Sequence, residues 1–240
     1  MEILKLTAAD FKKSDSRWKD YIGKQDVSNY DGNIEIEANL GYIRFVRLKA
    51  KGYISAGSGT GIEAGEGIEA GRGINAGRGI NAGRGINAGW GINAGWGIKA
   101  GDGIKAGEGI KAGDGIKAGD GIQAGRGIKA GECIKAGWFI KAGRGIKAGE
   151  GIKAGWGIKA GWGIEAGCGI EAGLNIHCAL ALFASYRIFV GVAVWKSTIL
   201  YEEKTITCGK LESGEICYGI LNEIGMPESK PVIEELKAIH

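Results

Sequence analysis

The stretch 151–162 reads Gly-Ile-Lys-Ala-Gly-Trp-Gly-Ile-Lys-Ala-Gly-Trp, and it is typical of everything between residues 61 and 180. That region is a hexad, Gly-Ile-x-Ala-Gly-y, repeated twenty times in tandem, with isoleucine at every sixth position from Ile62 to Ile176. A period of six is not a multiple of 3.6, so no helical stripe can form. Ile-x-Ala instead suits a short strand whose isoleucine and alanine point to one side and x to the other. The repeat therefore predicts short strands joined by glycine-containing corners.

Tandem strands of this kind predict an all-β protein, a parallel β-helix. Three hexads would complete a triangular coil of about 18 residues, and two would complete a flattened coil of about 12; we favour three. Twenty hexads then make nearly seven coils, a prism about 30 Å long at ~4.8 Å per strand. We expect a left-handed coil, although the order aliphatic-x-small reverses the small-x-aliphatic order of hexapeptide acyltransferases.

The two glycines of the hexad differ in how strictly they are kept. The glycine after alanine is unbroken from Gly65 to Gly173, whereas the glycine before isoleucine is replaced by Cys133, Phe139 and Asn175. A corner needs either a positive φ or a close backbone approach, and glycine supplies both. We expect the unbroken glycine to be the strained position and the other to be chosen for crowding.

Both ends of such a solenoid need covering, because they are open sheet edges. Residues 1–60 are predicted to form an N-terminal cap and the first, degenerate coils, with a helix-like stretch at 14–22 and coil strands within 34–57. After the solenoid at 61–180, residues 181–240 are predicted to form a C-terminal cap. This cap would hold bulky strands, a β-hairpin with Cys208 and Cys217 on either side of its turn, and a tail with a short helix at 232–239.

Composition excludes several classes of protein. With 47 glycines but only 2 prolines the chain is not collagen-like, and 44% hydrophobic residues are enough for an ordered interior. The N-terminus lacks the apolar core of a signal peptide, and no apolar run is long enough to span a membrane. Five cysteines, odd in number and irregularly spaced, are most simply reduced thiols. We therefore expect a cytoplasmic protein of a bacterium or an infected host cell, with no membrane partner.

Only positions x and y are free to carry function. Between residues 97 and 162 they hold ten lysines and two arginines against six acidic residues. One interpretation is a solvated, mixed-charge surface that keeps the sheet soluble, with tryptophans that stack on each other and on arginine. The other is a basic ladder with interleaved Arg and Trp that binds a nucleic-acid backbone or an acidic protein. For that second interpretation the predicted binding residues are Lys99, Lys117, Lys135, Lys153, Arg126, Arg144, Trp138, Phe139, Trp156 and Trp162.

Two finer expectations concern the aromatic residues. In an 18-residue coil Trp138 lies directly below Trp156, while Trp90 and Trp162 share another edge. The stretch 133–139, with Cys133 and Phe139 in place of glycine, is the predicted specific patch.

No catalytic constellation is present. The two histidines are His177, at an outward x position, and His240, the last residue. Metal-binding, nucleophile and P-loop motifs are missing from the sequence. The chain is therefore predicted not to be an enzyme and to need no cofactor or metal.

The run Gly-Ile-Lys-Ala-Gly-Trp-Gly-Ile-Lys-Ala-Gly resembles glycine-rich hexad-repeat solenoid proteins of bacteria, their phages and mobile elements, over residues 52–180. The resemblance implies a rigid repetitive surface, and for phage proteins of this kind an anti-CRISPR-like inhibitor that binds a bacterial defence nucleoprotein. The implied partner is a protein or ribonucleoprotein, with RNA as a further candidate and a homodimer through a terminal cap as another. The alternatives are a self-assembling, bactofilin-like structural protein and a carbohydrate-binding solenoid.

Overall fold

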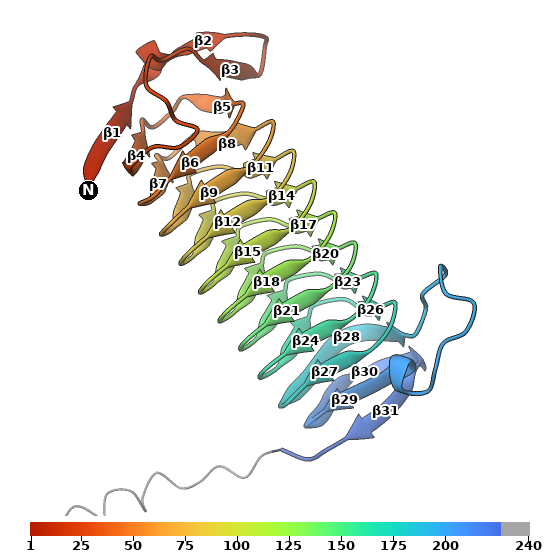
Figure 1. Cartoon of the computed structure of the whole chain (residues 1–240). Coiled ribbons are helices and arrows are strands. Elements are labelled where there is room, and N and C mark those ends of the chain that lie inside the picture. The colour runs from red at the N-terminus through yellow and green to blue at the C-terminus, as the bar shows by residue number, and fades with distance from the viewer. Residues whose placement is uncertain (227–240) are drawn as a thin grey trace, which may run out of the picture.

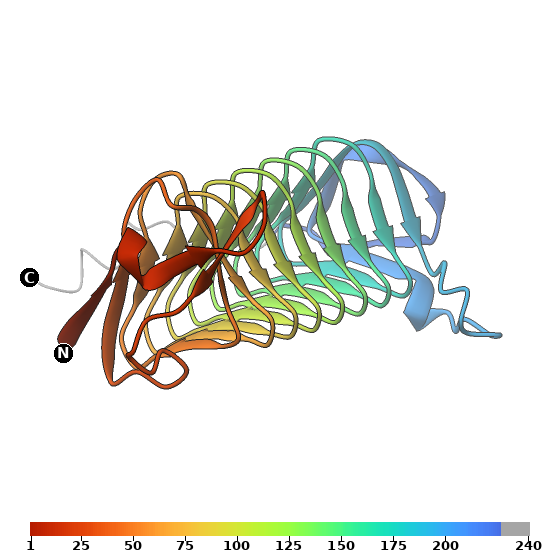
Figure 2. The same cartoon turned by 90° about the horizontal axis from the view of Figure 1, so that it is seen from above.

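In the computed structural model, which describes residues 1–226, the first hexad belongs to a five-residue strand and each later hexad forms a three-residue strand whose middle residue points outward. The strands pair in parallel and in register: Ile74 lies beside Ile92, and Asn75 beside Asn93. The chain thus returns to the same face after 18 residues, which confirms the triangular coil and rules out the 12-residue one. The coils stack into a prism that runs the length of the molecule (Figures 1 and 2).

Three columns of strands form the faces of the prism. The first face consists of β1 (Glu2–Leu6), β4 (Gly32–Ile36), β7 (Ile54–Ala56), β10 (Ile74–Ala76), β13 (Ile92–Ala94), β16 (Ile110–Ala112), β19 (Ile128–Ala130), β22 (Ile146–Ala148) and β25 (Ile164–Ala166). The second face consists of β3 (Trp18–Tyr21), β5 (Gly41–Phe45), β8 (Thr60–Ala64), β11 (Ile80–Ala82), β14 (Ile98–Ala100), β17 (Ile116–Ala118), β20 (Ile134–Ala136), β23 (Ile152–Ala154) and β26 (Ile170–Ala172). The third face consists of β6 (Leu48–Ala50), β9 (Ile68–Ala70), β12 (Ile86–Ala88), β15 (Ile104–Ala106), β18 (Ile122–Ala124), β21 (Ile140–Ala142), β24 (Ile158–Ala160), β27 (Ile176–Cys178), β29 (Thr205–Cys208) and β31 (Ile220–Glu223).

Isoleucine and alanine fill the interior. Every isoleucine of the repeat is at most 2% exposed, and each lies beside an isoleucine of the next coil except Ile164, which lies beside Leu182. Burying one isoleucine side chain contributes roughly 2–3 kcal/mol, and this gain must outweigh the backbone entropy that each glycine loses. Because each coil buries its interior only against its neighbours, the stability belongs to the stack and not to a single coil.

Crowding, not a positive φ, explains the unbroken glycine. Neither glycine of the repeat has a positive φ; in the described chain such glycines lie outside the hexads. A Cβ on Gly125, which follows an alanine, would collide with the carbonyl oxygen of Gly107 in the preceding coil. A Cβ on Gly127, which precedes an isoleucine, would lie 3.4 Å from the carbonyl oxygen of Gly145, so side chains are tolerated there. The expectation of a conformationally strained glycine was therefore wrong: the glycine after alanine is needed because the backbone of the preceding coil approaches too closely for a Cβ.

The N-terminal end is closed by a hairpin. Strand β2 (Phe11–Lys13) pairs antiparallel with β3, which in turn pairs parallel with β5. Stretch 14–22 is thus the turn and second strand of this hairpin, and the expected helix is wrong. The rings of Phe11, Tyr21 and Phe45 pack with centroids 5.4–5.7 Å apart and cover the end of the core. The coil strands expected within 34–57 are confirmed as β4 to β7.

The C-terminal strands continue the solenoid. Strand β28 (Ala181–Val190) bends round one corner and pairs in parallel with both β25 and β26, and β30 (Lys210–Tyr218) pairs in parallel with β28. Since β29 pairs in parallel with β27 and β31, the expected hairpin is wrong. The segment between β28 and β29 projects from the side of the prism (Figure 1).

The helix expected at 232–239 and His240 lie outside the described residues. Within residues 1–226 the helical structure amounts to two short 3-10 turns, Ala8–Asp10 and Glu202–Lys204, and no helix there is long enough to cross a bilayer.

Candidate functional site

The lysines at position x form three separate ladders, one on each face. Strand register places lysine beside lysine, for example Lys99 beside Lys117 and Lys111 beside Lys129. The first-face ladder comprises Lys111, Lys129 and Lys147. The second-face ladder comprises Lys99, Lys117, Lys135 and Lys153, the four lysines selected from the sequence. The third-face ladder comprises Lys105, Lys141 and Lys159, with Gln123 between the first two.

The corner residues at position y form three edges, along which each backbone N–H donates to the carbonyl one coil before. The arginine edge, between the third and first faces, holds Arg72, Trp90, Glu108, Arg126, Arg144 and Trp162. The acidic edge, between the first and second faces, holds Arg78, Trp96, Asp114, Glu132 and Glu150. The tryptophan edge, between the second and third faces, holds Glu66, Arg84, Asp102, Asp120, Trp138 and Trp156.

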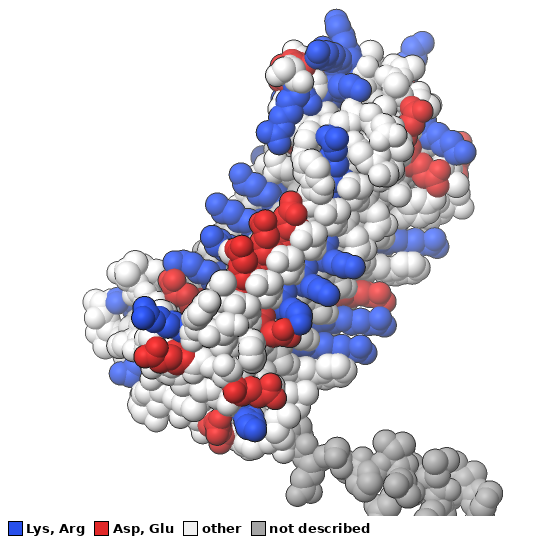
Figure 3. Space-filling model, turned by 180° about the vertical axis from the view of Figure 1, so that it is seen from behind, with Lys and Arg blue, Asp and Glu red and all other residues white. Residues whose placement is uncertain are grey.

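These columns sort charge around the prism. Between residues 97 and 162 the second-face ladder has four lysines, and the two edges beside it carry five carboxylates. In the same range the arginine edge and its two neighbouring ladders carry six lysines and two arginines against the single carboxylate of Glu108. Figure 3 shows a run of acidic side chains along the middle of the prism, with basic side chains on either side of it. The lysine ladder selected from the sequence is therefore bordered by acidic residues on both sides, whereas the first- and third-face ladders each have the arginine edge on one side, and the basic side of the molecule lies around that edge.

The first-face and second-face ladders each end, on the C-terminal side, in an ion pair with a glutamate of the next coil. Lys147 pairs with Glu165 at 2.5 Å, and Lys153 pairs with Glu171 at 2.7 Å. Toward the N-terminus asparagines replace the lysines, as at Asn93, so the ladders are bounded on both sides. Their extent of three or four coils corresponds to about 14–19 Å.

A groove of about 980 Å³ runs along the first face, beside the arginine edge. Its floor is glycine backbone, because the glycine before each isoleucine contributes no side chain there. One wall is the first-face lysine ladder; Glu108, Arg144 and Trp162 of the arginine edge form the other. The glycines of the floor are Gly91, Gly109, Gly127, Gly145 and Gly163.

The C-terminal end of this groove is apolar. It is lined by Leu180, Phe183 and Met226 together with Trp162, and Glu212 is the acidic residue nearby. Phe183 stands at the outward position of the first face, one coil beyond Glu165. A hydrophobic residue in the column that otherwise carries charge gives the groove two chemically distinct halves.

The corner tryptophans are stacked, as the more conservative interpretation of the sequence expected. The rings of Trp138 and Trp156 are parallel within 8°, with their centroids 5.5 Å apart. The ring of Trp195, in the projecting segment, stacks on Trp156 with a centroid distance of 5.7 Å. The placement of Trp138 below Trp156 is confirmed. Trp162 has the guanidinium of Arg144 over its ring at 5.0 Å, and Trp90 has that of Arg72 at 5.4 Å.

The stretch 133–139 does not form one patch. Cys133 lies at the acidic edge and donates a hydrogen bond to Glu150 (Sγ···Oε2 3.1 Å), and burial raises its pKa. Phe139 begins the third face beside the tryptophan edge, where its ring covers Gly121 of the preceding coil. Strand β20 separates the two residues.

A second aromatic cluster, at the N-terminal end, was not predicted from the sequence. The guanidinium of Arg17 lies 5.0 Å from the ring of Trp18 and 4.8 Å from that of Tyr42, and Arg78 lies over both Tyr42 and Trp96. These contacts fasten the N-terminal hairpin to the acidic edge. No local sequence motif predicts these contacts, because the partners are far apart in the chain.

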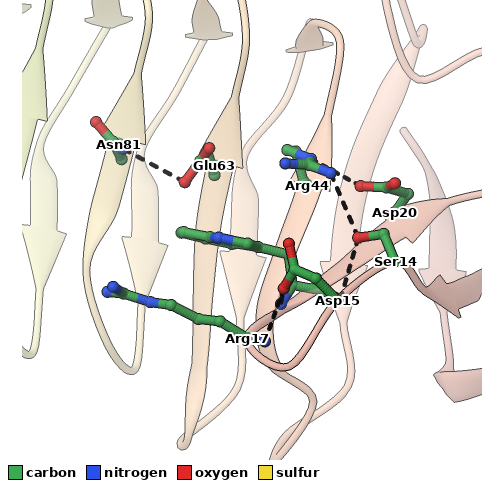
Figure 4. A network of polar contacts seen from close by, with 8 residues as sticks. Ser14, Asp15, Arg17, Asp20, Arg44, Glu63 and Asn81 are labelled. Carbon is green, nitrogen blue, oxygen red and sulfur yellow. Dashed lines mark hydrogen bonds and ion pairs between the residues drawn. The ribbon is translucent and has the colours of Figure 1, made fainter.

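Polar contacts hold the same hairpin on the second face (Figure 4). Arg44 donates to Asp20 (Nε···Oδ1 2.7 Å) and keeps the pKa of that carboxyl below its usual value. Asp15 accepts hydrogen bonds from the backbone of Arg17 and Trp18. Asn81 donates to Glu63 at 3.4 Å, which continues the contacts into the repeat.

The cysteines predicted to flank a hairpin turn do not meet. Cys208 is buried in the third face, whereas Cys217 is exposed on the second. Cys208 instead occupies the inward position next to Cys178, one coil away. Burial raises the pKa of Cys178 to about 12 and that of Cys208 to about 11, so both thiols are protonated at neutral pH.

Comparisons of this chain with protein-family models, with curated proteins and with solved structures give no match.

Proposed function

We propose that the chain is a non-enzymatic binding scaffold that holds an acidic partner against its basic side, meaning the arginine edge and the lysine ladders of the first and third faces. The sorting of charge around the prism carries this proposal. Between residues 97 and 162, corner carboxylates border the second-face lysines along both edges. Along the arginine edge Glu108 is the single carboxylate, and Arg126 already pairs with it at 3.6 Å, while Glu165 pairs with Lys147 at the end of the first-face ladder.

Two physical effects make an acidic molecule the favoured partner of these ladders. Lysines directly beside one another on neighbouring strands repel each other, and an acidic ligand laid along the ladder relieves that repulsion. A surface of one sign also steers an oppositely charged partner and raises its association rate. Because the ladders stand on a stacked sheet, the backbone positions that carry the cations are fixed before the partner arrives.

An inhibitor that blocks a bacterial defence nucleoprotein would be one scaffold of this kind, with its basic side seated on acidic groups of the complex. End-to-end self-assembly is less well supported. At the N-terminal end the antiparallel β2 interrupts the parallel stacking, and the Phe11 cluster covers the core.

The test compares two matched triple variants. One neutralises the basic side (Lys111→Gln, Lys129→Gln and Arg144→Gln), and the other neutralises the second face (Lys99→Gln, Lys117→Gln and Lys135→Gln). Glutamine already occupies an outward strand position at Gln123, and the corner column of Arg144 accepts Arg, Trp and Glu, so the fold should tolerate both. Binding of fluorescent polyglutamate is followed by anisotropy over a salt series.

We expect the basic-side variant to lose about tenfold in affinity, at ~0.5 kcal/mol for each exposed charge. The second-face variant should stay close to wild type. Equal losses in both variants, or no salt-sensitive binding by wild type, would contradict the proposal.

A further inference from the structure

We infer that the groove beside the arginine edge takes an extended, acidic segment of a partner protein that carries one bulky apolar side chain. This inference rests on the proposed function and specifies its ligand. The two halves of the groove, one cationic and one apolar, are its basis.

The cationic half is centred on Lys111, Lys129 and Arg144. Among the described residues none of these three forms an ion pair, whereas the carboxylates of Glu108 and Glu165 are held by Arg126 and Lys147. Carboxylates of a ligand would therefore meet ammonium and guanidinium groups that have no ion-pair partner. Hydrogen bonds from such charged donors are stronger than those from neutral donors.

The apolar half lies about two coils further along, among Trp162, Leu180, Phe183 and Met226. Trp162 and Met226 are each about half exposed, so a ligand side chain could bury new apolar surface there. Glu212 at this end would repel a carboxylate. The acidic part of the ligand must then lie over Lys111 and Lys129, and its apolar residue at the Phe183 end.

The dimensions suit a single extended strand. From Gly91 to Ala181 the groove follows six coils, or about 24 Å at the strand spacing. At ~3.4 Å per residue this length takes about seven residues of extended peptide. The glycine floor allows the ligand backbone to approach closely.

A single-stranded nucleic acid suits the same groove less well. Proteins that bind single strands without sequence preference stack bases on free aromatic faces. Here each corner tryptophan already has a face occupied: by arginine at Trp90, Trp96 and Trp162, and by another indole at Trp138 and Trp156. Electrostatic attraction remains, but at most one face of each corner tryptophan is left for stacking on a base.

The test uses short fluorescein-labelled peptides of alternating glutamate and serine, with either phenylalanine or alanine at one end, made in both chain directions. A short oligothymidylate is the competing probe. We expect the better phenylalanine peptide to bind the full chain about tenfold more tightly than its alanine counterpart. Phe183→Ser should abolish this difference and leave the alanine peptide unaffected.

Phe189→Ser is the matched control, because Phe189 stands beyond Glu171 on the second face as Phe183 stands beyond Glu165 on the first. It should change neither peptide's affinity. If the phenylalanine and alanine peptides bind equally, or if the oligothymidylate binds more tightly than both, the inference is wrong while the proposed function stands. A cross-link from a photoreactive group at position 183 to residues 227–240 would make the chain its own occupant and would also overturn it. If no acidic probe binds, the proposed function itself fails.

Discussion

Two glycines that flank one corner residue should respond in opposite ways to the same substitution. Gly125 and Gly127 lie on either side of Arg126, and neither has a positive φ. A Cβ on Gly125 would collide with the carbonyl of Gly107, and the N–H of Gly125 donates to Ala106 at 3.2 Å. Gly125→Ala must therefore push two coils apart. Overpacking costs ~1–3 kcal/mol and an unmade buried hydrogen bond a similar amount, so we expect a loss on the order of 3 kcal/mol.

Gly127→Ala is the matched control. Its Cβ would meet a carbonyl oxygen at 3.4 Å, an ordinary contact, and alanine reduces the freedom of the unfolded chain. We expect a stabilisation of about 0.4–1 kcal/mol. Urea unfolding followed by far-UV circular dichroism would compare the midpoints of the variants, since stacked repeats need not unfold in two states. A Gly125→Ala variant as stable as wild type, or a Gly127→Ala variant less stable than Gly125→Ala, would contradict the crowding at Gly125.

Two further predictions concern buried thiols and the tryptophan stack. Because burial holds the pKa of Cys178 at about 12 and that of Cys208 at about 11, the unfolded chain releases these protons first, near pH 9. The free energy of unfolding should therefore be steady below about pH 9 and fall as the pH rises toward 11. In a Cys178→Ala, Cys208→Ala variant urea midpoints should depend less on pH, and an unchanged dependence would count against it. Trp156 lies between Trp138 and Trp195, so Trp156→Ala should release the segment 191–204 and speed tryptic cleavage after Lys196. The control Trp90→Ala should not, and equal cleavage rates would show that the stack does not hold the segment.

The regular part of the fold was predictable because one short unit decides every contact in it. Once three hexads make a coil, the positions of Trp138 and Trp156 follow, as do those of the lysine ladders. The strands after residue 180 were harder, since bulky residues hide the period: Thr205–Cys208 and Ile216–Tyr218 look like a hairpin but extend the parallel columns. The N-terminal hairpin depends on distant partners such as Tyr42 and Arg44, which no local pattern reveals.

The position of the basic side could have been predicted from the sequence, but it was not. Asp114, Glu132 and Glu150 are spaced 18 residues apart, so the coil length alone places them on one edge. Charge summed along the chain conceals this sorting, and charge sorted by coil position reveals it. The apolar end of the groove is different, because Met226 and Phe183 meet only through the arrangement of the last coils.

The coil of three hexads also restricts how this array can change in length. Neighbours in space are 18 residues apart, but the repeated unit has only six. Gain or loss of one hexad would still leave isoleucine beside isoleucine, yet it would turn everything downstream by a third of a revolution. The arginine edge would then run into a different edge at the junction, and the groove would be cut. Recombination between near-identical units can therefore produce chains that fold and have lost their surface. Only changes by whole coils, three hexads at a time, lengthen the groove and keep it continuous.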